Sequence, residues 1–297
     1  MKKTGDSGIL PVMKAQPLAP GAFLLPLALG RDFLLAHAQG TEVLAEKDIL
    51  AHHAGALDLI RVVHLPWEID TRRINLAGPD PARREADLDH LKRLISAAAP
   101  LAPARYVIHP LGLRHWDGRS AGDWDTLVAM LRRLADETRA ERTGPLVIEN
   151  NRTYWNGIPD TTPVEAADRS NVNRCFGETP AEWRDLCLAV DRDDVRLCLD
   201  LSHATTSAHL YPKGPQREAC LREFLTPRDW IIHVHWSDNF LDDNRGRADS
   251  HEYPGRGTLP RWFHQEVRRL PATFMFEIST DPQAVLETLD FVRARQE

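Results

Sequence analysis

Residues 146–149 read Leu146-Val147-Ile148-Glu149, a short run of apolar side chains that ends in a carboxylate. From residue 58 onward the same pattern recurs: an apolar run ends in a polar residue, and a segment with helical spacing follows. Near-continuous apolar runs are typical of parallel strands that are buried on both faces. The other five runs span residues 59–64, 106–109, 195–200, 230–235 and 273–277.

The segments between these runs have the spacing of amphipathic helices. Within residues 81–98, Leu88, Leu91 and Ile95 fall on one face of a helix. Residues 124–135 and 285–292 repeat this spacing. Strands that alternate with helices predict βαβ units and a parallel sheet.

An open doubly wound sheet and a closed barrel both have this alternation. Six runs end in a residue that can bind a metal, and in a closed barrel such ends converge around one axis. In an open sheet only the ends near the switch point would meet. A length of 297 residues also suits one barrel of about 250 residues with insertions. The sequence therefore predicts an α/β fold, a single (β/α)8 TIM barrel.

No linker divides the chain into domains. Residues 58–297 are expected to form most of the barrel, and residues 1–57 to contain its first unit, with a strand in 21–29 and a helix in 46–57. The polar insertion 152–178 contains Pro159 and Pro163, and we expect it to form a lid-like loop over the mouth.

The bulk composition excludes several classes of protein. A net charge of −6 provides no global basic surface for nucleic acid. No stretch has the ~18 uninterrupted apolar residues of a membrane span. The amino terminus loosely resembles a signal peptide, but charged residues and prolines interrupt it. Four cysteines without a C-x-x-C pair predict buried thiols in a reducing compartment, so we expect a cytoplasmic protein with no implied protein partner.

A set of histidines and carboxylates follows the strand ends and the loops after them. Nitrogen and oxygen ligands of this kind suit zinc, manganese or iron. Buried carboxylates need a compensating charge, and no Lys or Arg interrupts these strand ends. A metal centre is therefore favoured over a buried polar network. The candidate ligands are His64, His109, Glu149, Asp200, His203, His235, Asp249, His251 and Glu277.

From about residue 58 to its end, the chain resembles the endonuclease IV branch of the xylose isomerase-like barrel superfamily. The resemblance depends on an ordered set of motifs rather than on any single one. These motifs are His64-Leu65-Pro66-Trp67, residues 74–80, Ile108-His109-Pro110, Ile148-Glu149-Asn150, residues 199–203, residues 233–238, Asp249-Ser250-His251 before Gly255-Arg256-Gly257, and Phe276-Glu277.

The resemblance implies divalent ions, with zinc expected at up to three sites and manganese or iron as alternatives. One ion would take His64, His109 and Glu149. A second would take Glu149, Asp200, His235 and Glu277, and a third would take His203, Asp249 and His251. Such a multinuclear site implies hydrolysis of a phosphoester, which is the leading functional hypothesis from the sequence.

The sugar isomerases and epimerases of the same superfamily are the main alternative. The resemblance implies one ion there, at Glu149, Asp200, His235 and Glu277, with Glu149 and Glu277 as the catalytic acid–base pair. The remaining candidate ligands are surplus to that mechanism, which favours the hydrolase. A third hypothesis is a non-catalytic, metal-stabilised barrel.

Three further residues are candidates for substrate binding: Trp67 by stacking, and Arg152 and Arg256 by contact with an anion. Five extra residues precede Ile74, where endonuclease IV places a DNA-intercalating loop. This departure and the 152–178 insertion weigh against duplex DNA. We expect a small phosphorylated or sugar substrate.

Overall fold

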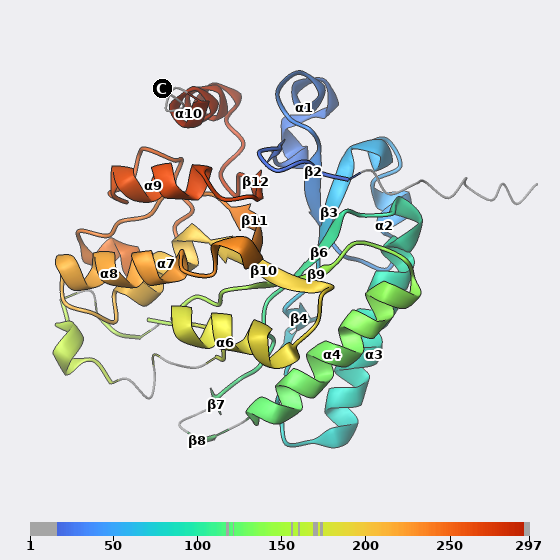
Figure 1. Ribbon diagram of the computed structural model, residues 1–297, viewed down its shortest axis with the longest axis horizontal. Coiled ribbons are helices and arrows are strands. Elements are labelled where there is room, and N and C mark those ends of the chain that lie inside the picture. The colour runs from blue at the N-terminus through green and yellow to red at the C-terminus, as the bar shows by residue number, and fades with distance from the viewer. Residues whose placement is uncertain are drawn as a thin grey trace, which may run out of the picture.

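A sheet of eight parallel strands forms the centre of the computed structural model (Figure 1). The structure describes residues 17–293 except 117, 118, 121, 156, 160, 169–171, 173 and 174. The strand order is β1-β12-β11-β10-β9-β6-β3-β2. Between its two edges, the N–H of Leu25 donates to the carbonyl of Gly40 (3.2 Å) and that of Gln39 donates to Phe23 (2.9 Å). These bonds nearly close the sheet into the predicted (β/α)8 barrel.

All six strands predicted after residue 58 are present in the sheet, in the predicted order. They are β3 (Ile60–His64), β6 (Arg105–Ile108), β9 (Leu146–Glu149), β10 (Val195–Asp200), β11 (Ile231–His235) and β12 (Thr273–Met275).

The segment 1–57 contributes two strand–helix units, although the sequence had indicated one. They comprise β1 (Phe23–Leu24), α1 (Arg31–His37), β2 (Thr41–Leu44) and α2 (Ile49–His52). Both strands are too short to produce a recognisable apolar run, which explains why the sequence left their register open.

The longer helices lie outside the sheet (Figure 1). Their first turns are capped as their sequences require: Asp80 accepts hydrogen bonds from the N–H groups of Ala82 and Arg83, and Asp123 accepts one from Thr126. The helices of this outer layer are α3 (Pro81–Ala98), α4 (Trp124–Ala140), α6 (Pro180–Val190), α7 (Leu201–Ala208), α8 (Pro215–Phe224), α9 (Arg261–Arg268) and α10 (Pro282–Arg293). No helix among the described residues is long and apolar enough to cross a membrane.

A small apolar cluster inside the barrel lies two residues before the candidate ligands of the strands. It contains Val62, Val107, Val147, Cys198 and Met275, together with Leu24. Side chains two positions apart on a strand point to the same face. The residues that follow at the strand ends therefore project toward the barrel axis above this apolar layer, and the strand pattern itself produces the ring of ligands.

The insertion 152–178 has a small apolar core of its own, formed by Trp155, Val164 and Val172 together with Leu210. The indole N–H of Trp155 donates to the carbonyl of Thr206 (2.9 Å), so the insertion is attached beside α7. Of its described residues, only Arg152 and Tyr154 line the central pocket. These two form a side wall of the mouth.

Candidate metal centre

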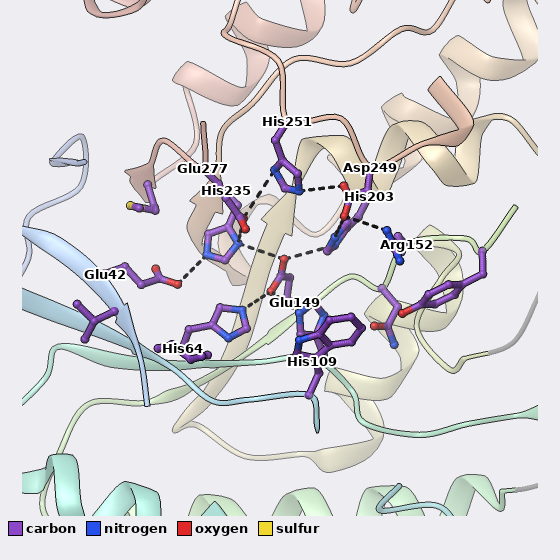
Figure 2. A pocket seen from close by; sticks show the side chains of 16 residues that line it. Glu42, His64, His109, Glu149, Arg152, His203, His235, Asp249, His251 and Glu277 are labelled. Carbon is purple, nitrogen blue, oxygen red and sulfur yellow. Dashed lines mark hydrogen bonds and ion pairs between the residues drawn. The ribbon is translucent and has the colours of Figure 1, made fainter. Parts of the chain in front are cut away.

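One pocket of about 400 Å³ opens at the carboxyl ends of the strands. Eight of the nine predicted ligands line it, and Figure 2 shows their side chains pointing toward one another. The ninth, Asp200, is fully buried directly beneath, with its Oδ2 3.9 Å from Nδ1 of His235. The structure thus brings together all nine residues that the sequence singled out.

Glu149 lies at the centre of this cluster and is almost completely buried. Its Oε2 is 3.0 Å from Nε2 of His64 and 3.6 Å from Nε2 of His109. Its Oε1 is 3.1 Å from Nδ1 of His235 and 3.3 Å from Nδ1 of His203. One carboxylate therefore contacts four imidazoles, the arrangement expected of a group that bridges cation sites.

Besides Glu149, the imidazole of His235 faces three further carboxylates, those of Glu277, Asp200 and Glu42. Its Nδ1 is 3.1 Å from Glu277 as well as from Glu149, and it faces Asp200. Its Nε2 is 3.1 Å from Oε1 of Glu42. Because Nε2–H is bonded to Glu42, Nδ1 is the nitrogen left to bind an ion among the other three carboxylates.

Glu42, on β2, is a member of the site that the sequence reasoning missed. Its carboxylate is only 7% exposed and also accepts a hydrogen bond from Nε2 of His233 (2.8 Å). His233 in turn contacts the hydroxyl of Thr273 (2.7 Å). The only signal in the sequence was a glutamate in the four-residue segment Thr41-Glu42-Val43-Leu44, which is too short to be recognised as a strand.

A loop fixed by hydrogen bonds carries Asp249 and His251 into the pocket. Oδ2 of Asp249 is 3.2 Å from Nε2 of His203, and its Oδ1 is 3.0 Å from Nε2 of His251. The carboxylate of Asp238 supports the loop by accepting from the N–H of Gly255 (2.8 Å). Gly255 has φ +92°, so glycine is required for the bend that the sequence predicted there.

Asp200 is held by Asn150, the residue that follows Glu149. The amide of Asn150 donates to the carbonyl of Asp200 (3.0 Å) and accepts from its N–H (2.7 Å). Asp200 also caps α7 by accepting from the N–H of His203 (2.6 Å). Strand β9, strand β10 and helix α7 are thereby locked together at the point where the ligands meet.

The proximity of buried acids and bases shifts the pKa values of these groups. Burial raises the pKa of Asp200 to about 6 and lowers that of His109 to about 4. Burial opposes charge on Glu149 as well, yet the charges of His109 and His235 outweigh it and bring its pKa well below the usual value. Burial likewise opposes charge on His251, but the hydrogen bond to Asp249 raises its pKa to about 9. His251 thus carries a proton at neutral pH, and a bound cation would displace that proton.

The arrangement fits a divalent ion. Oδ2 of Asp200 and Nδ1 of His251 are buried and have no hydrogen-bond partner among the described residues. Several groups of ligand atoms lie within 4.8 Å of one another, among them His64 with His109 and Glu149, and Asp200 with His203 and His251. A mixed set of imidazole nitrogens and carboxylate oxygens suits zinc, manganese or iron.

Two of the three predicted substrate-binding residues reach the pocket, and the third does not. Trp67 and Arg152 line it. Arg256 instead pairs with Glu287 of α10 (2.7 Å) and lies over the ring of Tyr253, so it does not line this pocket as the sequence had predicted. The sequence placed Arg256 after a strand end, but the Gly255 bend directs it toward the outer helices.

A model of the xylose isomerase-like TIM barrel family matches residues 39–295. The chain belongs to this family. That match includes strands β2 to β12 and all nine predicted ligands. No curated protein matches the sequence significantly.

Solved structures similar to this chain include three with almost complete coverage. A D-tagatose 3-epimerase-like protein has 17% identity and a TM-score of 0.60, covering 93% of this chain and 100% of that one. A Thermus thermophilus protein soaked with ZnCl2 has 20% identity and a TM-score of 0.60, with 93% and 98% covered. The 3-keto-D-glucoside 4-epimerase of E. coli has 15% identity and a TM-score of 0.59, with 92% and 99% covered. At these identities the similarity establishes the fold.

Proposed function

We propose that this chain is a metal-dependent sugar isomerase or epimerase. The observation that supports the proposal best is the grouping of Glu149, Asp200 and Glu277 around Nδ1 of His235, each within 3.9 Å of it. The similarity to epimerases favours this function over the phosphoester hydrolase that led the sequence analysis. A pocket of about 400 Å³ is also the size of a small-molecule site rather than of a groove for duplex DNA.

The two glutamates differ in their access to substrate. Glu149 is 1% exposed, whereas Glu277 is 47% exposed to the pocket. A bound divalent ion would polarise a substrate carbonyl. In the mechanism proposed here, Glu277 would act as the base that removes a proton from the carbon beside that carbonyl, and Glu149 would be the second acid–base group. The histidine–carboxylate contacts hold both groups in place for this transfer.

The direct test is exchange of substrate hydrogen with solvent. The protein, loaded with Mn²⁺ or Zn²⁺, is incubated with D-fructose, D-tagatose or their 6-phosphates in D₂O and followed by NMR. We expect deuterium at a carbon beside the carbonyl. Glu149→Gln and Glu277→Gln should lower the rate at least about 100-fold, because general acid–base catalysis contributes that much.

A matched control separates loss of chemistry from loss of metal or fold. Glu85→Gln alters an exposed glutamate of α3, remote from the pocket, and should exchange like the wild type. Metal content and thermal melts are measured for every variant. Absence of exchange with every sugar by a fully metal-loaded protein would contradict the proposal.

A multinuclear phosphoester hydrolase is the second candidate. A single ion would need no more ligands than His235, Glu149, Asp200 and Glu277. Five further ligand-type side chains contact the same cluster: His64, His109, His203, Asp249 and His251. This candidate predicts about three ions per chain by elemental analysis, and cleavage of bis(p-nitrophenyl) phosphate that falls in His64→Ala and His251→Ala. One ion per chain and no cleavage would exclude it.

A further inference from the structure

A short hairpin beside the pocket carries Arg73, which has no role in the proposed function described above. Strands β4 (Glu68–Ile69) and β5 (Arg72–Arg73) pair in antiparallel fashion directly after Trp67. This hairpin contains the extra residues between Trp67 and Ile74.

Arg72 fixes the hairpin to the barrel. Its guanidinium forms two hydrogen bonds with the carboxylate of Asp87, which is fully buried on α3 (2.5 and 3.2 Å). Oδ2 of Asp87 also accepts from the N–H of Asn75 (3.1 Å). Neighbouring residues of a strand point to opposite faces, so anchoring Arg72 outward directs Arg73 toward the mouth.

Arg73 lies between two aromatic rings at the mouth. Its guanidinium is 4.0 Å from the ring centre of Trp67 and 5.0 Å from that of Tyr154, and Nη1 donates to the Tyr154 hydroxyl (2.7 Å). Among the described residues, no carboxylate forms an ion pair with it within 4 Å. By contrast, Arg72, Arg114 and Arg256 each have a carboxylate partner.

Arg152 places a second guanidinium on the same tyrosine. It lies 4.6 Å from the ring centre of Tyr154, and its Nη1 is 3.5 Å from Oδ2 of Asp249. Figure 2 shows it at the edge of the ligand cluster, beside Asp249. The distance of 3.5 Å between Nη1 of Arg152 and Oδ2 of Asp249 is longer than that of an ordinary hydrogen bond. If Asp249 binds a cation, its charge is taken up there and Arg152 is free to bind another anion.

Arg152 lines the central pocket, and Arg73 lines a smaller hollow beside it. Trp67 and His109 line both the central pocket and the smaller hollow that contains Arg73. Trp67 and His109 therefore connect the hollow of Arg73 with the pocket that contains Glu277 and Arg152. Planar guanidinium groups held by aromatic rings suit bidentate contact with phosphate or carboxylate oxygens.

We propose that Arg73 and Arg152 form an oxyanion subsite, which holds a phosphoryl or carboxylate group at the far end of the substrate. The inference rests on the proposed function for the identity of the near end, a sugar carbonyl. It narrows the substrate class to sugar phosphates or sugar acids, and it assigns to the β4–β5 hairpin the selection of charged over neutral sugars.

Binding measured by calorimetry tests the subsite without requiring turnover. D-Fructose, D-fructose 6-phosphate and D-fructuronate are titrated into the metal-loaded protein, and inorganic phosphate is titrated separately. We expect one of the two charged sugars to bind at least about 10-fold more tightly than D-fructose, because a charge-assisted hydrogen bond contributes that much. The stronger of the two identifies the phosphoryl or the carboxylate group.

Arg73→Gln should reduce this preference by lowering the affinity for the charged sugars much more than the affinity for D-fructose, with metal content unchanged. Glutamine keeps a donor for Tyr154, so the mouth retains its packing. Arg256→Gln is the matched control, since Arg256 also lies over an aromatic ring but outside the pocket, and it should bind like the wild type. Arg152→Gln should weaken the charged sugars as well.

Equal binding of charged and neutral sugars by the wild type, or failure of both inorganic phosphate and the charged sugars to bind, overturns the subsite. An equal loss for all sugars in Arg73→Gln also overturns it. Tight binding of a charged sugar without solvent exchange leaves the subsite intact and instead contradicts the proposed function.

Discussion

At the scale of single residues, Glu42 determines which nitrogen of His235 faces the other ligands. Its carboxylate lies between His233 and His235 and accepts a hydrogen bond from each. An acidic residue in this position keeps the Nε2 proton in place and makes Nδ1 the better ligand. Glu42 is thus a positioning residue, although it lines the pocket.

Glu42→Gln should weaken metal binding by about 10- to 100-fold, because loss of such a supporting carboxylate has effects of that size. The amide cannot accept from both imidazoles at once, so His235 loses its fixed tautomer. Zn²⁺ affinity, measured by competition with a coloured chelator, is the readout, with Glu85→Gln as control. An unchanged affinity with a lowered melting temperature would show that Glu42 only supports the fold.

Residues were predictable from the sequence where the chain repeats a pattern. His64, Glu149 and Asp200 each end a readable apolar run. Glu42 and Arg73 do not: the first lies inside a four-residue strand, and the second acts through Tyr154, which is 81 residues away in the sequence. The residues around Arg73 in the sequence give no indication of a partner 81 positions away.

At the scale of elements, helix α7 joins the ligand ring to the outer layer. Asp200 caps its first turn, and His209 ends it. His209 is fully buried, and its Nε2 donates to the carbonyl of Phe240 (2.9 Å). Gly246 packs so closely against both groups that a Cβ there would lie 1.9 Å from the Phe240 oxygen. The end of α7 therefore leaves no space for a side chain larger than that of glycine at position 246.

His209 should make the protein sensitive to acid. Burial, followed by the charge of Arg217, lowers its pKa to about 3. The unfolded chain takes up a proton near pH 6.5, but the native chain does not. The contribution of His209 to stability is therefore complete above pH 6.5 and falls as the pH decreases toward 3, by about 1.4 kcal/mol per pH unit.

His209→Gln should remove this dependence while keeping a donor for Phe240. Free energies of unfolding from urea titrations at pH 7, 6 and 5 give the difference between variant and wild type. We expect the deficit of the variant to shrink as the pH falls. A deficit that stays constant over this range would disprove the assignment, and the comparison cancels protonation of the ligand ring.

Elements after residue 58 were predictable because β/α units of ordinary length leave a clear period in the chain. The short strands β1 and β2 leave none, since two and four residues are too few to establish one. The order of the later strands was predictable because consecutive strands of a barrel are neighbours, and the ligand-type residues at the strand ends indicated a barrel.

At the scale of the whole molecule, the mouth concentrates five carboxylates among five imidazoles, so we expect its stability to depend on bound cations. The carboxylates are Glu42, Glu149, Asp200, Asp249 and Glu277, and the imidazoles are those of His64, His109, His203, His235 and His251. Ligands that bind only the native state stabilise it by mass action.

Removal of metal by a chelator should lower the melting temperature by several degrees. A ligand at 100 times its dissociation constant adds about 2.7 kcal/mol to the free energy of unfolding, and about 1 kcal/mol shifts a domain of this size by roughly 2–4 °C. Differential scanning calorimetry before chelation, after it and after re-addition of Zn²⁺ or Mn²⁺ measures the effect. The same melting temperature in all three states would indicate that hydrogen bonds alone hold these carboxylates and imidazoles together.

The insertion 152–178 has a consequence for how this protein can acquire new specificity. Its small core packs largely on itself, and its attachments to later parts of the chain include Leu210, the carbonyl of Thr206 and the bonds from Arg247 to Pro159 and Thr162. A replacement segment that keeps such attachments could be exchanged without rebuilding the barrel. Such an exchange would replace Arg152 and Tyr154 in the pocket wall and would leave the ligands at the strand ends unchanged.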